Sequence, residues 1–145
     1  MSVALLFCLV VGVTDGDTLT ARCGMEAPQT ITIRLAEIDA PERGQPFSAR
    51  SKQHLASLCF RKQAEVRAKT TDRYGRTVAR VTCSGTDANV AMVEAGMAWA
   101  FTKYVTDPRL PELQASAMAK RAGLWADPSP VPPWEWRSRK VEPQH

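Results

Sequence analysis

A β-hairpin is predicted near the start of the chain, around the dipeptide Asp15-Gly16. Asp-Gly between two strand-like runs is a strong short-range signal for a tight turn. The residues at 9–14 and 17–23 therefore predict two antiparallel strands joined at this turn. Such a hairpin restricts the fold to classes with antiparallel sheet, and it decides which residues of the two strands lie opposite each other.

The thirteen residues MSVALLFCLVVGV that precede the turn are almost all apolar. This run is too short for a membrane span, which needs about 20 residues. It also lacks the basic leading region and the Ala-x-Ala cleavage site of a complete signal peptide. A continuous apolar run can equally be a buried strand. We interpret 1–8 as an apolar segment in which the remnant of a truncated export signal meets the start of the first strand.

The four cysteines contain no Cys-x-x-Cys pair, so a zinc site is not expected. One explanation is that they are simply small buried side chains. However, Cys8 and Cys23 are nearly symmetric about Gly16, so they would face each other across the hairpin. This placement favours a disulfide, and disulfides are typical of exported proteins.

Periodicity and breaker residues predict further elements along the chain. Alternation indicates three strands, and helical spacing, caps and glycines indicate three helices. The strands are expected at 30–37, 64–69 and 77–83, and the helices at 46–59, 86–96 and 111–123. Five strands with a helix between the third and the fourth fit an OB-type barrel.

Length and composition are those of one ordinary domain. The chain has 145 residues, of which 44% are hydrophobic and 23% charged, as in soluble globular proteins. The net charge of +4 is compatible with a polyanionic partner without identifying one. From Ala126 onward the sequence is rich in proline and tryptophan without periodicity; it either packs back through Trp134 and Trp136 or remains a mobile tail.

Three charged motifs carry the functional information. Two acidic clusters, at 15–18 and 37–42, lie about twenty residues apart with Arg34 between them, and Asp72-Arg73-Tyr74-Gly75-Arg76 follows. Carboxylates at neighbouring strand ends can hold a hard cation, which prefers oxygen ligands. An arginine directed at the same place offers a planar fork to a phosphate. Together these groups indicate chemistry on a phosphodiester.

The motifs resemble those of the staphylococcal nuclease (thermonuclease-like) family. The resemblance rests on VTDGDTLT at 13–20, IRLAEIDAPE at 33–42 and DRYGRTVARV at 72–81, with Ala-Gly-Met-Ala at 95–98 and Gly-Leu-Trp at 123–125. It covers about residues 9–125. It implies an α+β fold, a five-stranded OB-fold barrel with three helices over 9–125, followed by a Pro/Trp-rich tail over 126–145.

The resemblance also implies a metal site. Asp17 and Asp39 match the family's two calcium-ligating carboxylates, and the main-chain carbonyl of Ala40 matches a third ligand. The implied cofactor is therefore Ca²⁺. Taken alone, Asp17 would be read as a turn aspartate that binds its own backbone, and Asp15 is expected to brace that turn rather than bind metal.

Catalytic and substrate-binding roles are implied for five more residues. Glu42 matches a glutamate that activates or orients the attacking water, and Arg34 and Arg76 match two phosphate-clamping arginines. Tyr74 matches an aromatic contact to the nucleotide phosphate, and Tyr104 part of a base-stacking wall. A sixth residue, Glu37, is expected to be an exposed surface residue outside the site.

The helix orientation of the family further implies a second disulfide, between Cys59 and Cys83. The expected function is that of a calcium-dependent nuclease, an endonuclease-like phosphodiesterase. It would act on DNA and/or RNA with low sequence specificity and leave 3′-phosphate ends. We expect a secreted or periplasmic monomer without stable membrane association after processing. The alternative is a non-catalytic OB-fold module that binds nucleic acid or protein.

Overall fold

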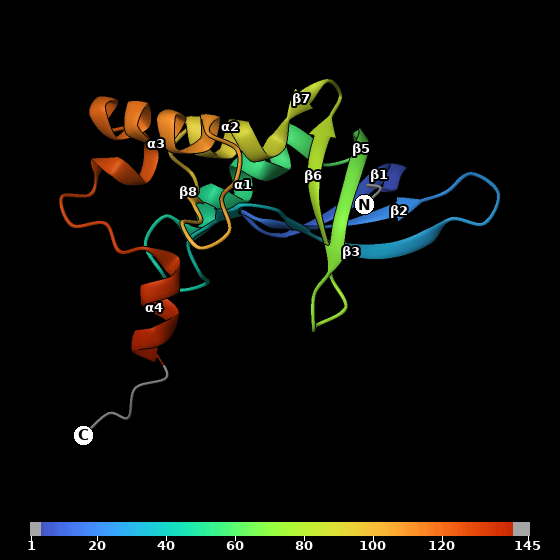
Figure 1. Cartoon of the computed structure of the whole chain (residues 1–145), viewed down its shortest axis with the longest axis horizontal. Coiled ribbons are helices and arrows are strands. Elements are labelled where there is room, and N and C mark those ends of the chain that lie inside the picture. Colours follow the sequence, from blue (N-terminus) through green and yellow to red (C-terminus); the bar gives the residue numbers. More distant parts are fainter. Residues whose placement is uncertain (1–3, 141–145) are drawn as a thin grey trace.

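The computed structural model describes residues 4–140 and contains a β-barrel with helices on one side (Figure 1). The strands are β1 (Ala4–Asp15), β2 (Thr18–Cys23), β3 (Gln29–Leu35), β4 (Ile38–Asp39), β5 (Gln63–Thr71), β6 (Thr77–Cys83), β7 (Thr86–Asp87) and β8 (Trp99–Ala100). The α-helices are α1 (Ser48–Cys59), α2 (Ala88–Glu94), α3 (Arg109–Lys120) and α4 (Pro133–Lys140), and Gly123–Ala126 form a 3₁₀ turn.

The five longer strands close into a barrel. They follow the order β3-β2-β1-β5-β6, and the short β7 pairs antiparallel with the end of β6. All neighbours are antiparallel except β3 and β6, which pair in parallel through Ile33 with Thr77 and Leu35 with Ala79 and so close the ring. The predicted α+β architecture with a five-stranded OB-type barrel is confirmed.

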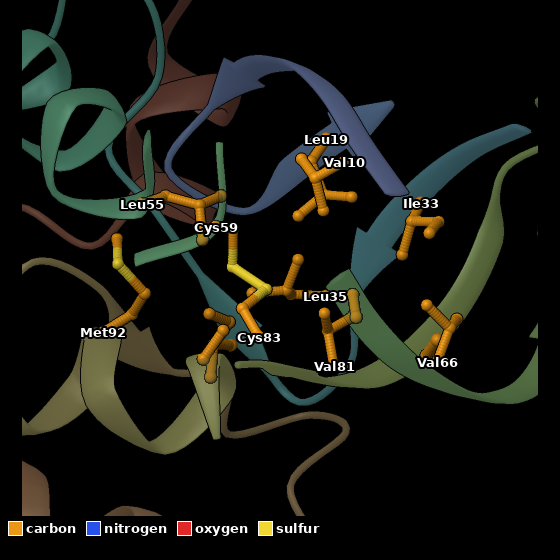
Figure 2. Close-up of a cluster of buried hydrophobic side chains, with 14 of the residues drawn as sticks. Val10, Leu19, Ile33, Leu35, Leu55, Cys59, Val66, Val81, Cys83 and Met92 are labelled. Atoms are coloured by element: carbon orange, nitrogen blue, oxygen red, sulfur yellow. A yellow bond between two sulfur atoms is a disulfide. The ribbon is translucent and has the colours of Figure 1, made fainter. Parts of the chain in front are cut away.

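The core fills the barrel and continues under the helices. Inward-facing strand residues such as Val10, Leu19, Ile33 and Val66 are fully buried, and Figure 2 shows their side chains directed at one another. Further buried residues from α1 and α2, including Leu55 and Met92, join the same cluster. Burial of each large aliphatic side chain contributes roughly 1.5–3 kcal/mol to the free energy of folding.

The first strand is longer and less buried than expected. It begins at Ala4 rather than residue 9, and Ala4 and Leu6 pair with Ala68 and Val66 of β5. The prediction of a buried strand is wrong for the outer face of β1. On that face Phe7 is 63% exposed, and Leu5, Leu9 and Val11 are also exposed. An unbroken apolar run does not reveal which of the two faces of a strand is covered. Met1–Val3, the rest of the expected signal remnant, lie outside the described residues.

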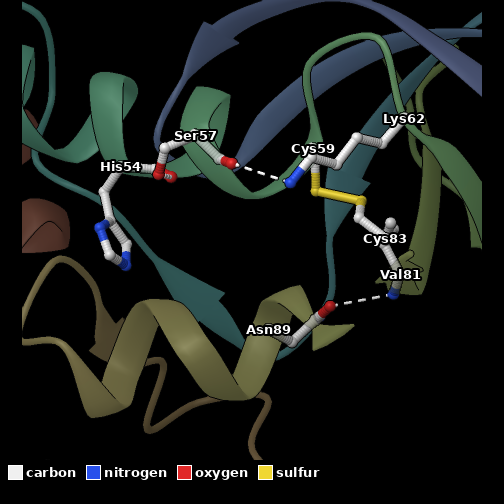
Figure 3. Close-up of a disulfide and its surroundings, with 7 residues drawn as sticks. All are labelled: His54, Ser57, Cys59, Lys62, Val81, Cys83 and Asn89. Atoms are coloured by element: carbon white, nitrogen blue, oxygen red, sulfur yellow. Dashed lines mark hydrogen bonds between the residues drawn. A yellow bond between two sulfur atoms is a disulfide. The ribbon is translucent and has the colours of Figure 1, made fainter. Parts of the chain in front are cut away.

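Two disulfides and one buried asparagine tie the helices and strands together. Cys8 bonds to Cys23 across the β1–β2 hairpin, and Cys59 at the end of α1 bonds to Cys83 at the end of β6. Both predicted pairings are therefore confirmed. In Figure 3, the Cys59–Cys83 bond lies near Asn89 of α2, whose Oδ1 accepts from the Val81 backbone N–H at 3.0 Å.

The segment after Ala126 packs back on the domain and forms a fourth helix, which was not predicted. Pro133 is its first residue, a position that tolerates proline because the first helical N–H groups need no intrahelical acceptor. With eight residues, α4 is too short for a periodic signal. The Trp134 ring stacks on Phe101, with 5.2 Å between ring centroids. Of the helices in residues 4–140, none has the length and apolar character needed to cross a membrane.

Candidate active site

An open groove of about 940 Å³ at one end of the barrel is lined by every predicted site residue except Ala40. They come from the β1–β2 turn, the end of β3, the segment around β4, the β5–β6 turn and the loop after β8. The groove is lined by Asp15, Asp17, Arg34, Asp39, Glu42, Tyr74, Arg76 and Tyr104, among others. Three motifs that are far apart in the sequence therefore share one site.

The β1–β2 turn meets the second acidic motif through a close contact. A Cβ atom on Gly16 would overlap the Ser51 side chain and lie 3.0 Å from the Ala40 Cβ, so only glycine fits there. This close approach of Gly16 to Ala40 lets the Ala40 backbone N–H donate to Asp17 Oδ2 at 2.8 Å. Asp17 is thus fixed next to Ala40, and its role is not confined to its own turn.

Arg34 lies between the two predicted metal-binding carboxylates. Its Nη1 donates to the carbonyl oxygens of Leu35 and Ile38 at 2.7 and 2.8 Å. Its Nη2 lies 3.3 Å from Asp39 Oδ1 and 3.5 Å from Asp17 Oδ2. Because one side of the guanidinium is held by backbone, the other side is presented to both carboxylates in a fixed orientation.

The donor set has the chemistry that a hard cation requires. Asp17 and Asp39 both direct a carboxylate oxygen to the same Arg34 nitrogen, so the two side chains converge on one point. The third predicted ligand is the backbone oxygen of Ala40, and oxygen ligands of this kind suit calcium. Nowhere in residues 4–140 do three or more His, Cys, Asp or Glu side chains form a group that could hold an ion. A cation here would depend on two carboxylates and a backbone carbonyl.

The β5–β6 turn presents Arg76 to the groove. Asp72 accepts from the backbone N–H groups of Tyr74 and Arg76, and its Oδ2 accepts from Arg76 Nε at 2.8 Å. Burial would raise the pKa of the Asp72 carboxyl, but these donors hold it below its usual range. Arg76 also lies over the Tyr74 ring, 5.5 Å from the ring centroid. The turn therefore orients Arg76 through a carboxylate and an aromatic ring.

Aromatic side chains border the groove. Tyr74 and Tyr104 are 67% and 56% exposed, as expected for residues that would contact a nucleotide. Tyr104 packs edge-on against Phe101, with 5.0 Å between ring centroids. Phe101 in turn stacks on Trp134 of α4, so the C-terminal segment supports this wall.

The expectation that Glu37 is a surface residue is wrong. Its side chain is 4% exposed, and it accepts hydrogen bonds from the backbone N–H groups of Thr106 and Asp107 and from Lys69 Nζ. Burial alone would raise the pKa of the Glu37 carboxyl, but these donors lower it to about 2. The sequence interpretation took the end of the predicted 30–37 strand to be exposed, although alternation puts Glu37 on the same face as Ile33 and Leu35. The structure covers that position with the loop before α3, which no local pattern predicts.

Sequence reasoning also missed Arg137 of α4, which reaches the centre of the groove. Its guanidinium contacts both oxygens of Asp39, at 3.1 and 2.7 Å, and Glu42 Oε1 at 2.6 Å. These contacts raise the pKa of Arg137 above its ordinary value, so it stays charged. The only signal was an arginine after two tryptophans, in a segment without periodicity.

The groove concentrates negative charge at its acidic end. Burial raises the pKa of the Asp39 carboxyl, and Arg137 and Arg34 only partly offset this effect. Burial, followed by repulsion from Asp17 and Glu42, likewise raises the pKa of Asp15. Carboxylates crowded in this way are stabilised by a nearby positive charge.

Known proteins with similar sequences share most of this chain. The model of a family described as "Staphylococcal nuclease homologue" matches residues 32–127. A protein of Haemophilus influenzae named as an uncharacterized endonuclease is 44% identical over 133 residues, which cover 92% of this chain and 74% of that protein. A micrococcal nuclease of Shigella flexneri is 43% identical over 139 residues, with 88% and 78% coverage.

A more distant relative is a staphylococcal-like nuclease of Arabidopsis thaliana. It is 37% identical over 108 residues, which cover 74% of this chain and 33% of that longer protein. The family model spans more than half of the present chain, and the bacterial relatives align with most of it. This protein therefore belongs to the staphylococcal nuclease family.

Proposed function

We propose that this protein is a calcium-dependent nuclease that cleaves DNA and/or RNA with low sequence specificity and leaves 3′-phosphate ends. Its general class, an enzyme that hydrolyses phosphodiester bonds, follows from its family membership and the names of its relatives. The finer proposal rests mainly on one observation. Asp17, Asp39, Arg34, Glu42 and Arg76 line a single groove.

Each of these residues has a role that its surroundings support. Asp17, Asp39 and the Ala40 carbonyl would hold the cation, which would supply positive charge and a bound water beside the phosphate. Arg34 and Arg76 would stabilise the charge that builds on the phosphate oxygens during attack. Glu42, whose side chain is 37% exposed in the groove, would orient the attacking water or accept its proton.

The substrate would be held by contacts that do not read sequence. Tyr74 and Tyr104 offer exposed rings on which bases can stack, and every base has a face for stacking. Arg73 and Lys103 add positive charge to the same groove, where they would attract the phosphate backbone. Such contacts are compatible with single-stranded DNA and RNA alike.

The second candidate is the non-catalytic binding module, which would need the arginines and aromatic rings but not the carboxylates. A DNA-containing gel assay run with calcium, with magnesium and with excess chelator separates the two functions. We expect strong cleavage with calcium and poor cleavage with magnesium, which demands tighter octahedral geometry. The variant Asp39→Asn should bind DNA but lose cleavage. Full cleavage in chelator would refute calcium dependence, and absence of cleavage with every metal would favour the module.

We further propose that the protein works as an exported monomer in an oxidising compartment. The two buried disulfides support this proposal, because such bonds persist where thiols are not kept reduced. Size-exclusion chromatography with light scattering would test the monomer, with a mass near 16.0 kDa expected.

A further inference from the structure

Arg137 contacts two predicted site residues of the groove, Asp39 and Glu42, from the far end of the chain. It is 98 positions from Asp39 in the sequence, yet two of its nitrogens pair with the two Asp39 oxygens. Asp39 itself is fully buried, and its Oδ1 also contacts Arg34. Both oxygens of the central carboxylate are therefore occupied by guanidinium groups.

The helix that carries Arg137 is anchored independently of this arginine. Trp134 stacks on Phe101 and packs edge-on against Trp99, with 5.2 and 5.7 Å between ring centroids. Gln45 makes a second link, because its Nε2 donates to the Val131 carbonyl at 2.6 Å while its Oε1 accepts from the Glu42 backbone N–H. Replacing Arg137 would therefore remove its charge from the groove and leave α4 docked.

Arg137 and a divalent cation would compete for the same carboxylate oxygens. A guanidinium can neutralise Asp39 and Glu42 in the metal-free protein, since it offers several donors in a planar fork. A calcium ion bound through Asp39 would compete with Arg137 for the crowded Asp39 oxygens, and its positive charge would repel the arginine. The contact of Arg137 with Asp39 is therefore expected to oppose binding of the ion.

We propose that Arg137 is a further positioning residue of this active site, which holds Asp39 and Glu42 before the cation binds and sets the cation affinity by leaving Asp39. This inference rests on the proposed cation site at Asp17 and Asp39. With an ion held by Asp17, Asp39 and the Ala40 carbonyl, Arg137 would lose its contact with Asp39 and keep its contact with Glu42.

The effect of Arg137 on calcium affinity depends on the fraction of molecules in which Arg137 is paired with Asp39. If Arg137 occupies Asp39 in roughly nine molecules of ten, the apparent calcium affinity is about tenfold weaker than that of the open site. Arg137→Gln removes this competition. Arg139→Gln is the matched control, because Arg139 is exposed on the same helix and its loss changes the net charge by the same amount.

The experiment is titration calorimetry of the full chain with calcium chloride, without nucleic acid. We expect Arg137→Gln to bind calcium about tenfold more tightly than the wild-type protein, while Arg139→Gln matches the wild type. Equal affinities of the two variants would overturn the proposal. If calcium also fails to bind the wild type and chelator leaves DNA cleavage intact, the proposed calcium dependence has failed as well.

A second measurement on the unmodified protein keeps the test independent of the variant's folding. Hydrogen exchange of the backbone amides of 133–140 is followed with calcium and with chelator. Because α4 is anchored without Arg137, these backbone amides should exchange at similar rates in both conditions, while the guanidinium N–H groups of Arg137, followed by NMR in the same samples, should exchange faster with calcium. Unchanged exchange of the Arg137 guanidinium, under conditions where calorimetry detects calcium binding, would count against a coupled movement.

Discussion

Arg73 and Arg76 belong to one turn, but they are held by different partners. Arg76 pairs through Nε with Asp72, whereas Arg73 is exposed and contacts Tyr74. Both are arginines in the groove, so charge alone does not distinguish them. The role of each depends on its hydrogen-bond partners.

Arg76→Lys should lower turnover by orders of magnitude while nucleic-acid binding persists with a salt-dependent affinity. Lysine keeps the charge but loses the bidentate fork that stabilises a phosphate in the transition state. Steady-state cleavage and fluorescence-anisotropy binding would be measured side by side, with Arg73→Lys as the control. Near wild-type turnover of Arg76→Lys would place Arg76 outside the site.

Glu42→Gln should reduce the cleavage rate by roughly 10²–10⁴-fold, the usual contribution of a positioned acid or base. Glutamine keeps the shape of the side chain and removes its negative charge, so the midpoint of thermal unfolding should change little. Glu65→Gln, on the exposed face of β5, is the control for loss of one carboxylate. If Glu42→Gln cleaves at the native rate, Glu42 is not the group that activates or orients water.

At the scale of elements, Glu37 joins the end of the barrel to the loop that leads into α3. Its carboxylate accepts from the Thr106 and Asp107 backbone, and Arg80 links Asp107 to Asp87 at the start of α2. Tyr104 lies in the same loop, so Glu37 also fixes this part of the groove wall. The backbone of Glu37 has a φ of 68°, which is uncommon for a residue other than glycine.

The lowered pKa of the Glu37 carboxyl predicts that the free energy of unfolding depends on pH. Its pKa is about 2 in the folded protein against an ordinary value of 4.5, so it contributes on the order of 3 kcal/mol to the free energy of unfolding at neutral pH. Because the folded-state pKa is lowered, this contribution is complete above pH of about 4.5 and is lost as the pH falls towards 2. Urea unfolding of the wild type and Glu37→Gln at pH 7 and pH 3 should show a difference that shrinks in acid.

The exposed Glu26 provides the control for that comparison, as Glu26→Gln removes a carboxylate from the β2–β3 loop. Its stability should match the wild type at both pH values. A gap between wild type and Glu37→Gln that is equally large at pH 3 and pH 7 would contradict the assignment of the lowered pKa.

At the scale of the whole molecule, the two disulfides close loops of different length. Cys8–Cys23 closes a loop of 15 positions within one hairpin, and Cys59–Cys83 closes one of 24 between α1 and β6. Chain-entropy estimates give each bond about 3 kcal/mol of stabilisation, with slightly more for the longer loop. The second bond is the one that connects the helical side to the barrel.

Protein purified from an oxidising compartment should contain no thiol that reacts with an alkylating agent unless a reductant is added. Intact-mass spectrometry after alkylation of the denatured protein measures this directly. The double variant Cys59→Ala/Cys83→Ala should unfold at lower temperature, with about 3 kcal/mol or more lost because the variant removes the cross-link and also leaves space in the core. Four alkylated cysteines in exported protein would contradict both the pairings and the argument for export.

Local patterns in the sequence predicted the five longer strands, three of the helices and most residues of the groove. Asp15-Gly16 specified the hairpin, whose near-symmetry brought Cys8 opposite Cys23, and alternation gave β6 its observed bounds of Thr77–Cys83. The charged motifs predicted the groove residues because each motif lies at a strand end or turn. Closure of the barrel was supplied by family resemblance, since periodicity contains no information about which strands pair.

Only the tertiary structure decided what covers each face. Glu37 was expected at an exposed strand position, but the loop at 101–107 covers it, whereas the outward-facing Phe7 of β1 stays exposed. The sequence likewise gave no reason to bring Arg137 to Asp39, because α4 reaches the groove through the packing of Trp134 on Phe101. Periodicity reports which side chains share a face, whereas contacts between distant segments depend on how complete elements pack.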